Sequence, residues 1–174
     1  MKIFSVLIIS IITGITVTSC SGNKSTTGTN SKPGSKELEE INTYLVQKDR
    51  ERIINYAERK NLVLKESSTG LWYYIINPGE GELLKENRKI TIEFECELLD
   101  GTMCYSSDET GTKEIILGRS GIETGLYEGL RMLKPGAEAI FILPPFLAYG
   151  LPGDGKKIPP RSVIVYKVRI LNIA

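Results

Sequence analysis

The segment from Leu143 to Pro160, LPPFLAYGLPGDGKKIPP, constrains this chain more than any other stretch of similar length. Proline fixes its own backbone φ, and glycine adopts turn conformations that other residues avoid, so the segment is predicted to be a rigid loop. A Tyr149-Gly150 pair stands near its middle, and Ile158 precedes two prolines at its end. The loop is therefore predicted to form an apolar rim with one phenol, which suits an apolar ligand that carries one carbonyl group.

The chain around this loop has the pattern of an antiparallel β protein with one short helix. From 90 to 98, and again in the last strand, apolar residues alternate with polar ones, the period of a strand with one wet face. The predicted strands lie at 71–76, 90–98, 115–117, 139–143 and 163–171. Asp100-Gly101 predicts a hairpin turn, and leucines at helical spacing predict a helix around Leu126 that ends at Pro135-Gly136. We expect residues 66–174 to form one α+β domain, with this helix covering the sheet.

The first nineteen residues have the pattern of an export signal. Lys2 precedes an apolar run from Ile3 to Val17, which is shorter than the ~20 residues that a membrane-spanning helix needs. The four residues that end at Cys20 resemble a bacterial lipobox, in which small residues precede a cysteine that is acylated. We expect residues 1–19 to be removed and Cys20 to anchor the protein in the bacterial cell envelope, facing the periplasm. An ordinary secretory signal that ends in cysteine is the alternative.

Two segments of different composition lie between the predicted signal and the domain. Residues 20–36, which begin at the lipidation candidate Cys20, are rich in Ser, Thr, Gly, Asn and Lys and are predicted to be a flexible tether. Residues 37–65 contain strong helix formers, and a helix is predicted from 37 to 61 with its apolar residues approximately on one side. This helix is interpreted as a stalk or as a helix packed on the domain, and a dimerisation helix is the alternative.

Charge and residue usage exclude several classes of function. The chain has 22 Lys and Arg against 21 Asp and Glu, and loss of Lys2 with the signal leaves 22 − 1 = 21 basic residues, so nothing favours a nucleic-acid partner. There is no histidine, which excludes Ser-His and Cys-His nucleophile pairs and histidine-containing zinc sites. We expect no metal and no cofactor. In an oxidising compartment Cys96 and Cys104 either pair or remain two buried thiols, and the sequence leaves both open.

The loop and its flanking residues resemble the FK506-binding-protein (FKBP) type of peptidyl-prolyl cis-trans isomerase, and the resemblance covers residues 66–174. The framework residues that carry it, besides the loop, are Leu98, Asp100-Gly101, Ser106-Ser107, Leu117-Gly118, Gly125, Glu128-Gly129-Leu130 and Pro135-Gly136. The resemblance implies a twisted antiparallel β-sheet wrapped around one short α-helix, here preceded by the N-terminal helix. It also implies a rotamase that assists the folding of exported proteins by acting on proline-containing unfolded or extended polypeptides.

Carried over residue by residue, the resemblance implies a pocket for the proline ring. Tyr149, Phe94 and Tyr166 would carry the catalysis, with the Tyr149 hydroxyl directed toward a ligand carbonyl. The backbone N–H of Ile122 or Glu123, at the start of a helix, would offer a second donor. The expected substrate-binding residues are Tyr105, Cys104, Ile122, Glu123, Leu126 and Ile158.

Three departures from the family pattern qualify this interpretation. The family usually has a tryptophan as the pocket floor where this chain has Leu126, and an aromatic residue followed by aspartate where it has Cys104 and Tyr105. Loss of that aspartate weakens the expected binding of macrolides more than it weakens catalysis. The combination of signal, tether, N-terminal helix and altered pocket is similar to that of the isomerase lipoproteins associated with gliding motility. The alternative is a non-catalytic module or chaperone that binds proline-rich or hydrophobic segments.

Overall fold

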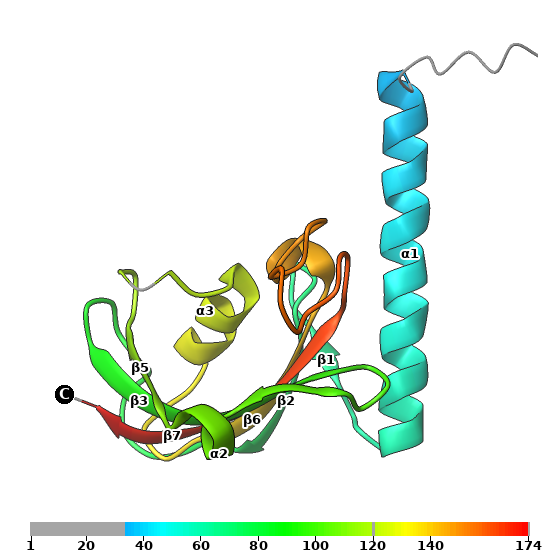
Figure 1. Ribbon diagram of the computed structural model, residues 1–174. Helices are drawn as coiled ribbons and strands as arrows, with labels where there is room; N and C mark the ends of the chain where they lie inside the picture. The colour runs from blue at the N-terminus through cyan, green and yellow to red at the C-terminus, as the bar shows by residue number, and fades with distance from the viewer. Residues whose placement is uncertain (1–33, 120, 174) are drawn as a thin grey trace, which may run out of the picture. The chain divides into compact units, whose positions relative to one another are not determined.

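The computed structural model describes residues 34–119 and 121–173, so the predicted signal, Cys20 and most of the tether lie outside it. A seven-stranded antiparallel sheet has the strand order β1-β2-β6-β7-β3-β4, and β5 pairs with β3 (Figure 1). The strands are β1 (Lys65–Glu66), β2 (Trp72–Asn77), β3 (Lys89–Leu98), β4 (Met103–Ser106), β5 (Lys113–Ile116), β6 (Glu138–Leu143) and β7 (Ile164–Ile173). The helices are α1 (Ser35–Lys60), α2 (Ser107–Thr110), α3 (Thr124–Arg131) and a 3-10 turn at Pro145–Leu147.

The two long central strands, β3 and β7, pair antiparallel along their length. One face of the sheet that they form is buried in the core, and the other is exposed to solvent. Ile92 and Cys96 are fully buried, whereas the glutamates between them face outward. On the outer face Glu93 lies opposite Arg169 in the register, and its Oε2 is 3.3 Å from Arg169 Nη1. The alternation seen in the sequence thus corresponds to one core face and one face that carries cross-strand ion pairs.

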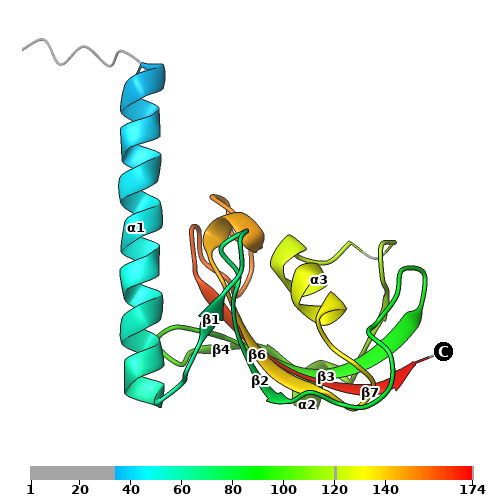
Figure 2. The ribbon, with the colours of Figure 1, turned by 180° about the vertical axis from the view of Figure 1, so that it is seen from behind.

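Helix α3 lies in the hollow of the curved sheet (Figures 1 and 2). Two glycines one turn apart allow this close approach. A Cβ on Gly125 would stand 2.6 Å from Leu143 Cγ, and one on Gly129 would stand 2.7 Å from the Phe141 ring, so neither position accepts a side chain. Leu126, from the same helix, is fully buried. The predicted α+β arrangement, a twisted antiparallel sheet around one short helix and preceded by an N-terminal helix, is confirmed.

Helix α1 packs on the domain through its second half. Ile53 and Tyr56 from this half join Trp72 and Ile142 from the sheet in a second core cluster, which we call the α1 seam. The Tyr56 hydroxyl also donates a 2.9 Å hydrogen bond to Glu97 Oε1 on β3. In the first half of α1, by contrast, apolar side chains are exposed. Within residues 34–119 and 121–173, no helix combines the length and the apolar character that crossing a membrane requires.

The short elements around the β3–β4 hairpin were not predicted from the sequence. Strand β4 pairs with β3, and Ser106 caps α2 by accepting a hydrogen bond from the Glu109 N–H at 3.3 Å. Cys96 and Cys104, both buried in this region, are free thiols. Burial raises the pKa of the Cys96 thiol to about 12, so this sulfur stays protonated.

Candidate active site

The loop that follows β6 is shaped by its own prolines and glycines. The 3-10 turn at Pro145–Leu147 opens it, and the Gly150 N–H returns to the Pro145 carbonyl at 2.8 Å. Gly153 has a φ of +72°, and a Cβ there would stand 2.3 Å from the Ile158 carbonyl oxygen. The loop therefore closes on itself where only glycine fits, as the sequence predicted, and it presents Tyr149 toward the sheet.

The loop and the sheet enclose an open pocket of about 400 Å³. Its aromatic wall consists of Phe94, Tyr105, Tyr149 and Tyr166, of which three had been predicted to carry catalysis and Tyr105 to bind substrate. The Phe94 and Tyr166 rings lie 6.3 Å apart with an interplanar angle of 51°, a tilted pair. The remaining lining residues run from the end of α2 to the first residue of β5, with one more from the loop: Thr110, Gly111, Thr112, Lys113 and Lys156.

A buried carboxylate holds the two tyrosines at one end of this pocket. Glu123, only 9% exposed, accepts hydrogen bonds on Oε1 from the Tyr149 hydroxyl and, at 2.8 Å, from the Tyr166 hydroxyl. Its Oε2 is buried and has no hydrogen-bond partner among the described residues. Burial, together with this carboxylate, raises the pKa of both phenols. Both hydroxyls therefore stay protonated and are committed to Glu123 in this structure.

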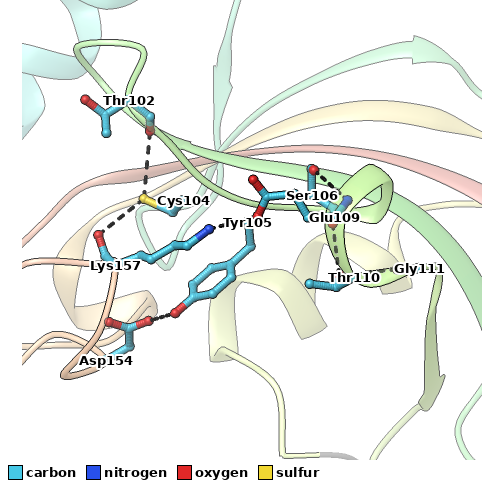
Figure 3. A network of polar contacts seen from close by, with 9 residues as sticks. All are labelled: Thr102, Cys104, Tyr105, Ser106, Glu109, Thr110, Gly111, Asp154 and Lys157. Atoms are coloured by element: carbon cyan, nitrogen blue, oxygen red, sulfur yellow. Dashed lines mark hydrogen bonds and ion pairs between the residues drawn. The ribbon is translucent and has the colours of Figure 1, made fainter.

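A second carboxylate, that of Asp154, lies beside the hydroxyl of the lining residue Tyr105 (Figure 3). Asp154 Oδ2 accepts a hydrogen bond from the Tyr105 hydroxyl, and Oδ1 accepts from the backbone N–H groups of Lys156 and Ile158, both at 2.8 Å. Burial alone would raise the pKa of Asp154, but these hydrogen bonds hold it below its usual value. The position of the family aspartate is occupied by Tyr105, and a carboxylate from the opposite loop lies beside that phenol.

The rest of the loop is tied to β4 and α2 by the same network (Figure 3). Lys157 Nζ pairs with Glu109 Oε2 at 2.8 Å and lies 5.4 Å from the centre of the Tyr105 ring. The Cys104 thiol donates to the Lys157 carbonyl at 3.6 Å. These contacts hold the outer part of the loop against the β3–β4 hairpin.

Four predicted substrate-binding residues belong to the core rather than to the pocket lining. Cys104, Leu126 and Ile158 are buried in the main core cluster, and Ile122 is half-buried against it. None of these four is among the described residues that line the pocket. Glu123 is also outside the lining: its side chain lies behind the wall, hydrogen-bonded to the Tyr149 and Tyr166 hydroxyls, whereas the sequence analysis had considered its backbone N–H.

The sequence analysis did not identify Asp154 or the two lysines that line the pocket, Lys113 and Lys156, as site residues. Asp154-Gly155 has the composition of a turn in which the aspartate accepts from the backbone two residues on, so the local bond to Lys156 had a signal. Its contact with Tyr105, 49 residues away, had none.

The site consists of an aromatic pocket with two carboxylates beside it. Glu123 is buried, and Asp154 accepts hydrogen bonds from the protein. No group of three or more Cys, Asp or Glu side chains within 34–119 and 121–173 is placed to hold a metal ion. The phenols are held protonated, and the pocket therefore suits binding and conformational change of a partly apolar ligand better than covalent chemistry.

Comparisons with known proteins show the family to which this chain belongs. The sequence profile described as FKBP-type peptidyl-prolyl cis-trans isomerase matches residues 80–171. The chain is 36% identical over 110 residues to a probable isomerase of this type, FkpA of Neisseria meningitidis, and 32% identical over 118 residues to FkpA of Escherichia coli. These alignments cover 63% and 68% of this chain and 40% and 42% of the two relatives, so the chain spans less than half of their length.

Solved structures of peptidyl-prolyl isomerases have a similar fold. The crystal structure of Escherichia coli FkpA aligns with a TM-score of 0.61 and 28% identity, over 82% of this chain and 74% of that one. A peptidyl-prolyl isomerase from Pseudomonas syringae aligns with a TM-score of 0.63, at 20% identity, over 76% of this chain and 95% of that one, which supports the fold alone. Fold and site define an aromatic-pocket α+β domain. The chain belongs to the FKBP-type peptidyl-prolyl cis-trans isomerase family, and this family prediction is confirmed.

Proposed function

We propose that the protein is a peptidyl-prolyl cis-trans isomerase that acts on proline-containing segments of unfolded or extended polypeptides. The observation that carries the proposal is the pocket of about 400 Å³ walled by Phe94, Tyr149 and Tyr166 in a domain of this family. The aromatic walls suit a proline ring, and the open side of the pocket leaves room for the polypeptide on both sides of it.

Isomerisation needs rotation about a partial double bond and no bond cleavage. The barrier is ~18–20 kcal/mol, and the uncatalysed step takes tens of seconds or more. Dry aromatic walls that fit the twisted amide better than the planar one, and a donor to the carbonyl before proline, lower that barrier. Phe94 and Tyr166 provide walls, and the proposed donor is the backbone N–H of Ile122 or Glu123, which lies next to the start of α3 and outside the pocket lining of this structure.

The Tyr149 hydroxyl is the second donor, and Glu123 controls it. A phenol that already donates to a carboxylate must exchange that partner for the substrate carbonyl, so its net contribution is smaller than that of a free donor. The proposed role of Glu123 is to hold the Tyr149 and Tyr166 rings in place while the proline is absent.

The decisive experiment follows the slow cis-to-trans phase of peptides with Leu or Phe before proline, with and without the protein. Acceleration at micromolar protein supports the isomerase. If the slow phase is unchanged while the folded protein still binds the peptide, the domain is a non-catalytic binding module instead.

The proposed place of action is the bacterial cell envelope, with the domain tethered through lipid at Cys20. Support comes from the sequence of residues 1–20 alone. Two or more acyl chains are needed for stable attachment, since one chain anchors only marginally. Cys20→Ser should abolish acyl labelling and leave unprocessed precursor, and normal cleavage with labelling of that variant would contradict the anchor. The finer assignment, an isomerase lipoprotein associated with gliding motility, rests on the combination of this signal with the tether, the N-terminal helix and the altered pocket.

Macrolide binding is proposed to be weak. Tyr105 occupies the position of the family aspartate, and both Asp154 oxygens already accept hydrogen bonds from the protein. Loss of one charge-assisted hydrogen bond, roughly 1.5–3 kcal/mol, lowers affinity by about one to two powers of ten. Tyr105→Asp should restore part of the inhibition, and potent inhibition of the unaltered protein would contradict the proposal.

Self-association through α1 is proposed as a further property of the anchored protein. Leu38, Ile41 and Tyr44 lie at helical spacing in its first half and are 52%, 49% and 59% exposed. Such a stripe gains by packing against a second copy. Sedimentation of the lipid-free protein measures this, and replacement of the three residues by Glu or Lys should leave only monomer.

A further inference from the structure

Helix α1 reaches the pocket loop through one buried ion pair. Asp49 lies on the packed face of α1 and is 3% exposed. Its Oδ2 is 2.7 Å from Arg161 Nη2, and Arg52 Nη1 approaches Oδ1 at 3.6 Å. Arg161 follows Pro160, the last residue of the segment that forms the loop. A side chain outside the matched family domain, residues 80–171, therefore binds the end of that loop.

The same arginine closes the loop through its backbone. The Arg161 N–H donates to the Gly150 carbonyl at 3.1 Å, directly beside Tyr149. Arg161 has a φ of +56°, a left-handed conformation that is uncommon for a residue with a side chain and that the surroundings must hold in place. Contacts thus run from Asp49 through Arg161 to Gly150, and from there to the neighbouring Tyr149.

The pair at Asp49 is hard to replace. Burial raises the pKa of Asp49, while Arg161 and Arg52 oppose that change. A carboxylate this deeply buried is tolerated because Arg161 balances it, and loss of one partner leaves the other uncompensated. The end of the loop is therefore fixed to α1 by an ion pair in which the Asp49 carboxylate is buried away from water.

We propose that Asp49 and Arg161 are positioning residues that hold the Tyr149 segment of the loop, so that α1 forms part of the active-site scaffold. The proposal rests on the proposed isomerase function for its catalytic consequence, but the ordering of the loop is measurable without it. Neither residue is among those that line the pocket, and both act through Gly150.

A second ion pair between α1 and the sheet provides a matched control. Arg50 Nη1 pairs with Glu66 on β1, and the two side chains are 43% and 29% exposed. It joins the same helix to the domain but does not contact the loop. Glu66→Gln therefore tests the effect of losing an α1 ion pair as such.

The experiment measures amide hydrogen exchange over residues 149–161, together with kcat and KM, in Asp49→Asn, Arg161→Gln, the double variant and Glu66→Gln. We expect faster exchange in this loop and about a tenfold lower kcat with little change in KM for each of the first two. The double variant should lose no more than either single variant, since both remove the same link. Glu66→Gln should change neither quantity. Rates are compared per folded molecule, so that a plain loss of stability does not imitate the effect.

The outcomes are separable. If loop exchange in Asp49→Asn matches that in Glu66→Gln, the link does not order the loop and the proposal is wrong. Faster exchange with unchanged kcat also overturns it, because the loop is then held for a reason other than catalysis. If the unaltered protein fails to accelerate isomerisation, the proposed function fails, and amide exchange of the loop alone then decides whether Asp49 and Arg161 hold it.

Discussion

The α1 seam and the aromatic pocket both contain aromatic side chains, yet their polar groups are arranged in opposite ways. In the seam, Tyr56 donates to Glu97 Oε1 at 2.9 Å, one phenol to one carboxylate. In the pocket, the Tyr149 and Tyr166 phenols share a single oxygen of Glu123, and the other oxygen has no partner among the described residues. An unpaired buried oxygen costs stability, and such costs are concentrated where a protein binds or reacts.

The two regions also differ in access. Ile53 and Ile142 of the seam are fully buried, whereas Phe94 and Tyr149 remain half-buried at the edge of an open pocket. A closed, satisfied cluster is expected to contribute to stability alone. An open cluster with a polar imbalance is expected to contribute to function as well, and substitutions can separate the two.

The largest effect is expected for Tyr166→Ala, which removes a 2% exposed ring from the pocket wall. Deletion of a buried aromatic ring costs about 3–5 kcal/mol of unfolding free energy. The opened wall admits water, so kcat/KM should fall by about 2 kcal/mol or more in addition. Denaturant unfolding and the isomerisation assay measure the two losses, with Tyr166→Phe as the control that keeps the ring. A Tyr166→Ala protein with normal kcat/KM would remove this residue from the site.

Ile142→Ala is the corresponding truncation of a buried side chain in the α1 seam. The side chain is fully buried, so its truncation should lower the free energy of unfolding by about 2–5 kcal/mol, and Ile142→Val by about 0.5–1.5 kcal/mol. Because Ile142 does not line the pocket, kcat/KM per folded molecule should stay within a factor of two or so of the unaltered value. A loss of activity as large as that of Tyr166→Ala would mean that the two clusters are not functionally distinct.

The sequence predicted the elements whose pattern is local. Strands β3 and β7 and helix α3 follow from a sustained alternation or a helical spacing of leucines, because burial of one face dictates these periods. The loop around Tyr149 was predicted for a related reason, since proline and glycine restrict the backbone whatever surrounds them. The order of the family's framework residues then implied the sheet topology that no local pattern gives.

The missed elements are those that tertiary contacts create. Strand β4 has four residues, too few for a period to appear, and it exists because Tyr105 pairs with Cys96 on β3. The sharing of Glu123 by two phenols joins positions 26 and 43 residues apart, which no spacing rule reveals. The register of the sheet and the approach of α3 bring these groups together, and both depend on the whole core.

The next prediction concerns Glu123, the residue that makes the pocket differ most from the seam. Glu123→Leu removes the shared acceptor and leaves the Tyr149 hydroxyl free for the substrate carbonyl. A hydrogen bond to a charged group is worth ~1.5–3 kcal/mol and a neutral one about 1 kcal/mol, so release should raise kcat/KM by about 1 kcal/mol, a factor of roughly five. Glu123→Gln, which keeps an acceptor, should raise it less. A fall in kcat/KM for the correctly folded Leu variant would instead show that holding the two tyrosine rings in place outweighs the gain from a free Tyr149 hydroxyl.

The smallest effect is expected for Tyr149→Phe in the unaltered background. This change removes one donor and little volume, and the donor is already engaged with Glu123, so kcat/KM should fall by about 1 kcal/mol or less, at most a factor of several. In the Glu123→Leu background the same hydroxyl no longer has a competing acceptor, so its removal should cost clearly more. The difference between the two costs measures the coupling between the carboxylate and the phenol. Equal costs in both backgrounds would show that Glu123 does not compete with the substrate for Tyr149, and that the polar imbalance of the pocket has no part in catalysis.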